Sequence, residues 1–171
     1  SDGYAIMYLD EIEKIMNYGK EKQKDRTIIN TTLLLVFAYF KNKIFRRPNA
    51  LKIEEQSVEM IQNRKERLPE AYNGNLNDIS VEIGISSKTL SKAIDILEEE
   101  LKLIVTDRAY RVKNENGKYK TLPTIFANAY KREDKYLLAA GEEYSRNEIK
   151  LKAEQMKKYY KGYKINENKR K

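Results

Sequence analysis

Residues 75–101 decide the fold of this chain, and they read NLNDISVEIGISSKTLSKAIDILEEEL. In the first part of this stretch, apolar residues recur at helical spacing: Leu76, Ile79 and Ile83. Gly84 stands where such a helix must end, because glycine tolerates the left-handed conformation of a helix end. The stretch therefore predicts two helices joined by a tight turn.

The second helix is predicted to begin at Ser86 or Ser87, because a hydroxyl there can satisfy the free N–H groups of the first turn. At 100° per residue the helix divides into two faces. The apolar face contains Leu90, Ala93, Ile94, Leu97 and Leu101, and the polar face contains Lys88, Ser91, Lys92 and Asp95. Such a helix can bury one side in a core and present the other to a major groove. Three glutamates at 98–100 would repel phosphate, so we expect that end to lie outside the groove.

A basic β-hairpin is predicted directly after the helix pair. Strand-like residues at 103–106, 110–112 and 118–122 surround an Asn-Gly dipeptide at 116–117, which is the strongest short-range hairpin signal. The segment carries five cations: Arg108, Arg111, Lys113, Lys118 and Lys120. A basic hairpin that follows a recognition helix is typical of a wing, which contacts DNA.

Over roughly residues 28–130, this order of elements resembles winged helix-turn-helix DNA-binding proteins. The resemblance rests on a buried helix, the helix pair LNDISVEIGISSKTLSKAIDILEEELKLI and the hairpin RAYRVKNENGKYKTLP. Among these proteins the chain is most similar to replication and copy-control proteins of small Gram-positive plasmids and phages. A long charged insert at 46–70 and a more basic C-terminus depart from them. The fold expected is mainly α with a small β-hairpin (α+β), a winged helix-turn-helix with extra N- and C-terminal helices.

Upstream of this motif, the strongest predicted helix covers residues 27–45, whose apolar residues make it the central element. Residues 4–9 are interpreted as a short strand leading into a helix that ends near Met16, with a loop at 18–25. The acidic residues Asp10, Glu11 and Glu13 fit either a metal site or a solvated helix start, and we favour the second. A surface helix is predicted over 52–68, and residues 72–74 are read as a turn after a short edge strand.

Downstream of the hairpin, a helix is predicted over residues 125–140, with Gly141 as its stop. The capping-box spacing at 145–148 then predicts a last helix. Its apolar stripe contains Ile149, Ala153, Met156, Tyr160 and Tyr163. Two interpretations stay open: a dimerisation helix, for which the stripe is the interface, or a helix docked on the chain's own core.

Two domains are expected from this pattern. Residues 1–141 form the winged helix-turn-helix domain, with its motif core at 75–122, and residues 142–171 form a basic C-terminal helix and tail. Residues 145–171 hold ten Lys/Arg and three Glu, and the stretch from residue 165 is expected to be disordered. The chain begins at Ser1 and not at a methionine, so we expect further residues in the natural protein.

The composition favours an anionic partner and excludes several chemistries. Among 171 residues there are 34 Lys/Arg, 26 Asp/Glu, no His and no Cys, for a net charge of +8. Without His or Cys there is no disulfide, zinc finger, thiolate or Ser-His-Asp catalysis, and no histidine-dependent nicking of an origin. The glycines form no phosphate-binding loop. We therefore expect no enzyme and no cofactor. No segment approaches the about 20 apolar residues that cross a bilayer, so we expect a cytoplasmic protein without a membrane partner.

The leading functional hypothesis is sequence-specific binding of double-stranded DNA by a homodimer, in plasmid or phage replication initiation, copy control or transcriptional regulation. The expected DNA-binding residues are Ser86, Ser87, Lys88, Thr89, Ser91, Lys92, Arg108, Arg111, Lys113, Lys118 and Lys120. The alternative is a winged-helix protein interaction module of a replication or partition complex, with replication proteins as partners. That alternative predicts an apolar or acidic exposed face, whereas the polar face here carries Lys88 and Lys92.

Overall fold

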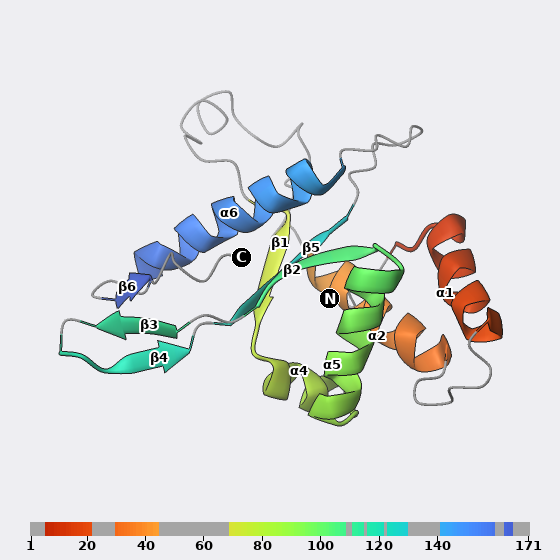
Figure 1. Cartoon of the computed structure of the whole chain (residues 1–171), viewed down its shortest axis with the longest axis horizontal. Helices are drawn as coiled ribbons and strands as arrows, with labels where there is room; N and C mark the ends of the chain where they lie inside the picture. The colour runs from red at the N-terminus through yellow and green to blue at the C-terminus, as the bar shows by residue number, and fades with distance from the viewer. Residues whose placement is uncertain are drawn as a thin grey trace, which may run out of the picture.

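The computed structural model describes residues 6–21, 30–44, 69–108, 111–114, 116–121, 123–129, 141–159 and 163–165. In chain order the elements are α1 (Leu9–Glu21), α2 (Asn30–Ile44), β1 (Ala71–Gly74), α4 (Leu76–Ile83), α5 (Ser87–Asp95), η2 (Ile96–Glu100), β2 (Ile104–Asp107), β3 (Arg111–Asn114), β4 (Tyr119–Thr121), β5 (Thr124–Asn128), α6 (Gly141–Tyr159) and β6 (Tyr163–Ile165) (Figure 1). The architecture is the expected α+β class, mainly helical with small antiparallel sheets. The predicted helix over 52–68 lies outside the described residues.

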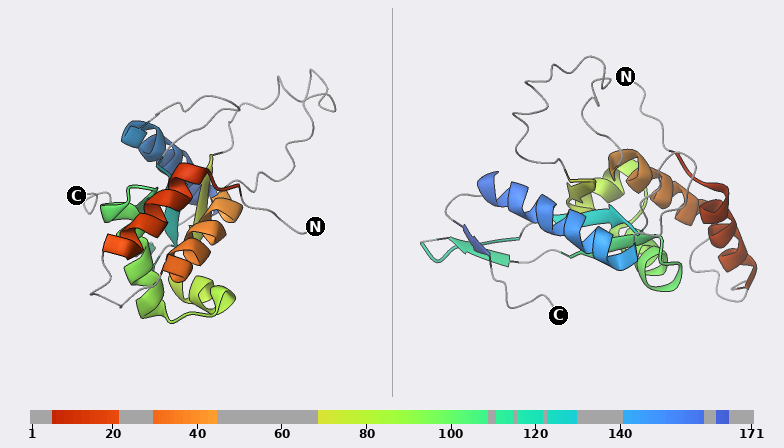
Figure 2. Two further views of the ribbon diagram at one scale, coloured as in Figure 1. Left: turned by 90° about the vertical axis from the view of Figure 1, so that its right-hand side faces the viewer. Right: turned by 90° about the horizontal axis from the view of Figure 1, so that it is seen from above.

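A three-stranded sheet in the order β1-β5-β2 forms the middle layer of the molecule. Both pairings are antiparallel, and Phe126 of β5 is the register partner of Tyr72 on β1 and of Thr106 on β2. Phe126 belongs to the core cluster of α2, α4 and α5, whereas Ile125 and Ala127 pack with residues of α6. Helices therefore cover both faces of this sheet (Figure 2).

The strand β5 corrects the prediction of a helix beginning at residue 125. Every residue of Thr124–Asn128 is buried, because helices cover both faces of the sheet. A strand buried on both sides has no alternation of apolar and polar residues, so periodicity cannot distinguish it from a buried helix. The β-branched and aromatic residues in TIFAN favour the strand. The rest of the predicted helix, from residue 130, lies outside the described residues.

The central helix α2 confirms the strongest helix prediction outside the motif. Five apolar side chains of α2 are buried: Leu33, Val36, Phe37, Phe40 and Ile44. The ring of Phe40 stacks on that of Phe126, with centroids 4.3 Å apart and planes at 26°. This stack joins the helical layer to the middle strand of the sheet, which makes it the centre of the core.

The N-terminal helix α1 is longer than predicted. It runs to Glu21, so the loop expected from residue 18 is wrong over 18–21, and residues 6–8 are not a strand. Glu11 is buried, and its Oε1 lies 3.1 Å from Nζ of buried Lys41 on α2. Glu11 is thus not solvated, which corrects the expected solvated helix start at this residue. Within the described ranges no group of three or more acidic residues could hold a metal ion.

The last long helix, α6, begins at Gly141 and not at Ser145. Ser145 is fully buried inside the helix, and its hydroxyl donates to the backbone carbonyl of Asn128 on β5, at 2.7 Å. The capping-box prediction is therefore wrong, as is Gly141 as a stop. Sequence spacing alone could not reveal that the serine hydroxyl had a partner on a distant strand.

The apolar stripe of α6 is docked on the chain's own sheet. Ile149, Ala153 and Met156 are buried at 7%, 1% and 4% exposure against Ala71, Ile125 and Ala127. The docking interpretation is confirmed for these three residues, and the proposed dimer interface through Ile149 and Met156 is wrong, because a surface already buried within one chain cannot pair with another. Tyr160 lies outside the described residues.

A second antiparallel sheet, in the order β4-β3-β6, extends from the end of the molecule opposite α1 (Figure 1). The strands β3 and β4 form the predicted hairpin around Gly117, whose φ of 77° is left-handed. The third strand, β6, comes from the C-terminal part of the chain. Tyr163 was predicted in the apolar stripe of the last helix and disorder was expected from residue 165, and both predictions are wrong at these residues because 163–165 forms a strand. In the described part of the chain, no helix is both long and apolar enough to span a membrane.

Candidate nucleic-acid interface

The turn between α4 and α5 is fixed by backbone hydrogen bonds at Gly84. This residue has φ 81° and ψ 32°, and its N–H donates to the carbonyls of Ser80 and Val81. The N–H of Ile85 donates to Ser80 as well, at 3.0 Å. A left-handed residue that satisfies the last carbonyls of a helix in this way is the usual glycine helix end, so the predicted role of Gly84 is confirmed.

The start of α5 is capped by Ser86, as expected. Its Oγ accepts a hydrogen bond from the N–H of Thr89 at 3.1 Å, and its backbone is extended. The hydroxyl of Ser87 instead turns back toward α4, where it donates to Oδ1 of Asn77 at 3.0 Å. Ser86 therefore caps α5, and Ser87 joins α5 to α4, while both remain exposed.

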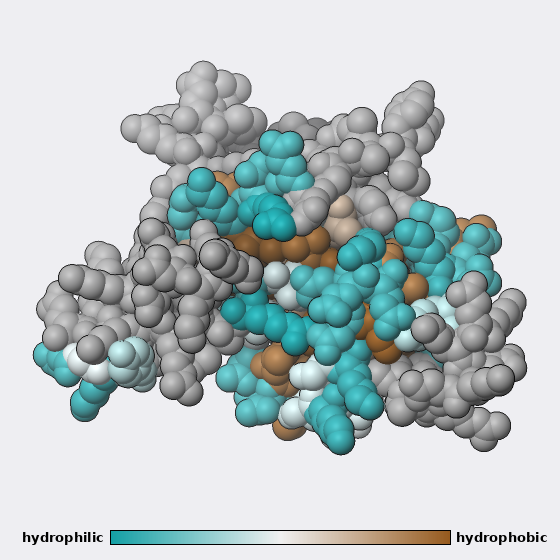
Figure 3. Space-filling view, viewed as in Figure 1, coloured by the Kyte–Doolittle hydropathy of each residue, from teal (hydrophilic) through white to brown (hydrophobic). Residues whose placement is uncertain are grey.

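The two faces of α5 are separated as the sequence predicted. Leu90, Ala93 and Ile94 have exposed fractions of 0%, 0% and 1%. On the other side, Lys88 and Lys92 are exposed, and Ser91 and Thr89 are half-buried. In the space-filling view, hydrophilic residues gather over α5, with apolar residues showing in small patches beside them (Figure 3). The structure thus leaves two cations, Lys88 and Lys92, exposed on the face of α5 opposite the core, and the cap residue Ser86 exposed at the start of the helix.

The helix η2, which continues α5, directs two of its three glutamates toward other elements of the chain. Glu98 accepts from the N–H of Thr106 on β2 at 3.0 Å, and Glu100 accepts from the hydroxyl of Tyr18 on α1 at 3.3 Å. Here the helix widens, because the N–H of Leu101 donates to the carbonyl of Ile96, five residues back. The carboxylates of Glu98 and Glu100 are therefore directed to partners on other elements, away from the turn that begins α5.

Arg108 was expected to contact DNA, and the structure gives it an intramolecular partner. Its guanidinium pairs with the carboxylate of Asp95 on α5, and both side chains are about half exposed, at 44% and 45%. The pair joins the end of β2 to the polar face of α5. Asp95 is the one carboxylate that the sequence predicted on the polar face of α5. Because Arg108 neutralises Asp95, this carboxylate does not cancel the positive charge of Lys88 and Lys92.

The remaining expected residues lie on the hairpin, away from α5 along the chain. Lys118 is exposed beside the turn, and the neighbouring Tyr119 is 62% exposed. Arg111 and Lys113 occupy β3 and Lys120 occupies β4, where the register pairs Arg111 with Thr121 and Lys113 with Tyr119. The structure therefore places the expected residues in two groups, one on the helix pair and one on the hairpin.

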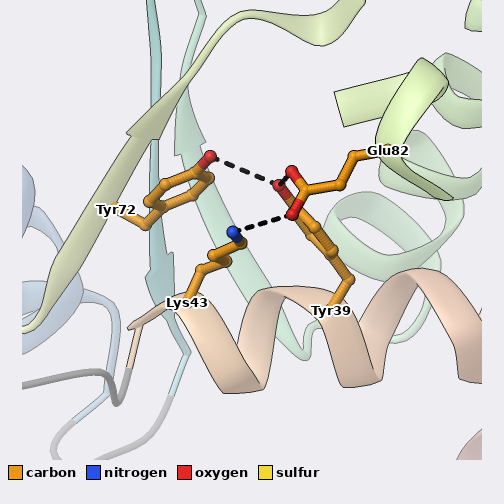
Figure 4. Close-up of polar contacts among 4 residues, drawn as sticks. All are labelled: Tyr39, Lys43, Tyr72 and Glu82. Carbon is orange, nitrogen blue, oxygen red and sulfur yellow. Dashed lines mark hydrogen bonds and ion pairs between the residues drawn. The ribbon is translucent and has the colours of Figure 1, made fainter. Parts of the chain in front are cut away.

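A polar cluster braces α4 against α2 and β1 (Figure 4). The hydroxyl of Tyr39 donates to Oε2 of Glu82 at 2.7 Å and lies 3.3 Å from the hydroxyl of Tyr72. Lys43 Nζ pairs with the other oxygen of Glu82 at 2.9 Å. Burial raises the pKa of Tyr39 far above its usual value, and the hydrogen bonds to Tyr72 and Glu82 raise it further. A tyrosine is protonated at physiological pH even at its usual pKa of about 10, so the phenol donates to Glu82 and helps to hold α4 in place.

Sequence reasoning missed this brace and missed Lys164, which β6 brings to the hairpin as the register partner of Lys113. Tyr39, Tyr72 and Glu82 are far apart in the sequence and carry no spacing signal. The stretch YKI at 163–165 does alternate around a lysine, which is the pattern of a strand with one solvated face. Its partner could be found only from the fold.

Comparison with known proteins identifies no relative. No protein-family model matches the chain, and neither the curated proteins nor the solved structures contain a significant match to it.

Proposed function

We propose that this protein binds double-stranded DNA in a sequence-specific manner through a winged helix-turn-helix. The single observation that carries the proposal is the outward face of α5, where Lys88 and Lys92 are exposed while Leu90, Ala93 and Ile94 are buried. The order α2, β1, α4, α5, β2, hairpin, β5 and the sheet order β1-β5-β2 support it. A helix held this way by a tight turn is suited to a major groove.

In this proposal the start of α5 enters the groove. Lysine can donate to O6 and N7 of guanine, and a serine hydroxyl pairs with several bases. Lys88 and Lys92 are four residues apart, on adjacent turns of one face, so they reach neighbouring bases. Ser87 is committed to Asn77 and holds the helix pair together. We assign base contact to Lys88 and Lys92, and phosphate contact to Ser86 at the groove edge.

A homodimer remains part of the proposal, because one recognition helix covers only a few base pairs and a twofold pair spans two successive major grooves. The dimer interface must lie elsewhere than the stripe of α6, which is buried within the chain. The setting proposed is replication initiation or copy control of a plasmid or phage, or transcriptional regulation.

Alanine at Lys88 or Lys92 is expected to weaken binding to the cognate site by about 1–3 kcal/mol. The loss on random duplex should be smaller, because a base contact carries sequence information and a phosphate contact does not. Fluorescence anisotropy titrations on both duplexes measure the two losses. Thermal unfolding should not change, since both side chains are exposed.

Lys150→Ala is the matched control, because Lys150 is an exposed lysine on α6, on the other side of the sheet. It removes the same charge without touching α5. A footprint of the protein on its own upstream region supplies the cognate site. If both α5 variants bind cognate and random DNA with wild-type affinity, α5 does not contact the DNA and the proposal is refuted.

Two substitutions of Ser86 separate its capping role from its proposed position at the DNA. Alanine removes the acceptor for the N–H of Thr89 and is expected to cost about 0.5–2 kcal/mol of stability. Aspartate keeps an acceptor at the cap, so stability should be retained, but it places a negative charge at the groove edge. We expect Ser86→Asp to bind duplex DNA more weakly than Ser86→Ala, as measured by titration at equal salt. The opposite ranking would place Ser86 away from phosphate.

The second candidate function is a protein interaction module, and the exposure of apolar side chains favours it. Val81 on α4 is 81% exposed and Leu9 on α1 is 71% exposed. Salt-dependent gel shifts on mixed duplex DNA distinguish the two candidates. An interaction module predicts no salt-sensitive DNA complex, whereas the proposed DNA-binding protein predicts one that weakens steeply as salt rises.

A further inference from the structure

The C-terminal strand β6 changes the hairpin from a two-stranded ribbon into a three-stranded sheet. β3 lies in the middle and pairs antiparallel with β4 on one side and with β6 on the other. Only residues 160–162 separate β6 from the end of α6. Because α6 is docked on the β1-β5-β2 sheet through Ala153 and Met156, it delivers β6 to β3 at a high effective concentration. We call β4-β3-β6, with the turn residue Lys118, the basic sheet.

The charge of the basic sheet is strongly positive. Its residues 111–114, 116–121 and 163–165 contain no Asp or Glu, and Glu115 is the one carboxylate between β3 and β4 in the sequence. They contain five cations: Arg111, Lys113, Lys118, Lys120 and Lys164. By contrast, the strands of the β1-β5-β2 sheet contain one charged residue, Asp107. The basic sheet therefore has the charge of a surface that binds a polyanion, whereas the composition of the β1-β5-β2 sheet is that of a buried core.

The register places a lysine of β6 opposite a lysine of β3. Lys113 is the Cα register partner of Lys164 on β6 and of Tyr119 on β4. The pairing of β6 therefore adds a cation from the C-terminal part of the chain to those of the hairpin. Cations that neutralise phosphates supply much of the affinity of a protein for DNA.

The width of the basic sheet decides how it can meet DNA. Neighbouring strands lie about 4.8 Å apart, so the outer strands of three are separated by roughly 10 Å before side chains are added. The minor groove is about 6 Å wide and cannot admit such a sheet face on. The phosphates that line the groove remain accessible to it.

We propose that β6 completes a three-stranded basic sheet that lies across the DNA phosphates beside the groove that α5 enters. This inference rests on the proposed function, and it assigns part of the C-terminal tail to the DNA surface as a paired strand and not as a loose basic arm. The strand pairing itself, and not only the tail charge, then contributes to binding.

The test uses the full chain with proline at both Tyr163 and Ile165. Proline lacks a backbone N–H and fixes φ at about −65°, far from the extended strand value, so two prolines in this three-residue strand disfavour its pairing, and this double variant keeps every lysine of the tail. The matched control, Tyr163→Thr with Ile165→Thr, replaces the same side chains by a residue that favours strands. Binding is measured by anisotropy on cognate and random duplex between 50 mM and 200 mM salt, and hydrogen exchange is measured at residues 111–114.

We expect the proline variant to lose exchange protection at residues 111–114 and to lower the salt slope by roughly 1–2, at about 0.9 for each lost phosphate contact. The loss should be equal on cognate and random duplex, and the threonine control should behave like the wild type. Unchanged protection in the proline variant would overturn the pairing. Lost protection with an unchanged salt slope would overturn the placement of the basic sheet on DNA.

The failure of this inference is distinguishable from the failure of the proposed function. If the wild-type protein binds no duplex at all, the proposed function fails and the placement on DNA fails with it, while hydrogen exchange still decides the pairing of β6. If Lys88→Ala weakens cognate binding and the proline variant keeps the wild-type salt slope, the proposed function stands and this inference is wrong.

Discussion

Replacing Phe126 by alanine is expected to lower the free energy of unfolding by about 3–5 kcal/mol. Phe126 is fully buried in β5, its ring stacks on Phe40 at 4.3 Å, and it lies 6.3 Å from the ring of Tyr72. The substitution removes the contact between the helical layer and the middle strand, and the fixed backbone on both sides prevents the cavity from closing. Urea unfolding followed by circular dichroism measures the change.

Tyr119→Ala is the control for the loss of an aromatic ring, because Tyr119 is 62% exposed on β4. It should change stability by less than about 1 kcal/mol. Phe126→Leu keeps most of the buried volume and should lie between the wild type and Phe126→Ala. A stability of Phe126→Ala equal to that of the tyrosine control would show that Phe126 is not at the centre of the core.

Replacing Met156 by glutamate is expected to have the second large effect, a loss of roughly 3–5 kcal/mol for an unpaired carboxylate in an apolar contact. Met156 is 4% exposed and packs with Ala71, Ile125 and Ala127 between α6 and the sheet. The loss cannot exceed the free energy with which α6 docks, because the helix can undock to return the carboxylate to water. Thermal unfolding and hydrogen exchange across α6 measure it.

Asn147→Glu is the matched control, since it makes the same charge change at an exposed position of the same helix. It should leave stability unchanged. Light scattering provides an independent check on the docking of the α6 stripe. A docked stripe predicts that Met156→Glu loses stability at an unchanged molecular mass, and a lower mass at wild-type stability would restore the stripe as a dimer interface.

The helix pair could be predicted from sequence because its determinants are local. The left-handed end at Gly84, the cap at Ser86 and the two faces of α5 each depend on residues within about two helical turns of one another. Intrinsic propensity, capping and amphipathic period act at that range and agree with one another here. The same holds for the hairpin, whose Asn-Gly turn fixes the pairing of β3 with β4.

Strand β5 and the start of α6 could not be predicted, because their determinants are distant. Thr124–Asn128 is buried on both faces only because α2 and α6 approach it from opposite sides. Ser145 has capping-box spacing, yet its hydroxyl is bound to Asn128 across the interface between α6 and β5. A prediction from neighbouring residues fails at such positions, because a residue distant in the sequence supplies the hydrogen bond or buries the side chain.

The candidate interface divides in the same way. The sequence by itself determined that Lys88 and Lys92 share the polar face of one helix, because a helix of 3.6 residues per turn places positions four apart on one side. Only the tertiary structure decided that Arg108 pairs with Asp95, that Ile149 and Met156 are buried in the chain's own core, and that β6 joins the hairpin. Even Arg108 and Asp95 are 13 residues apart in the sequence. No periodicity in a sequence indicates which distant segment a side chain or a strand will contact.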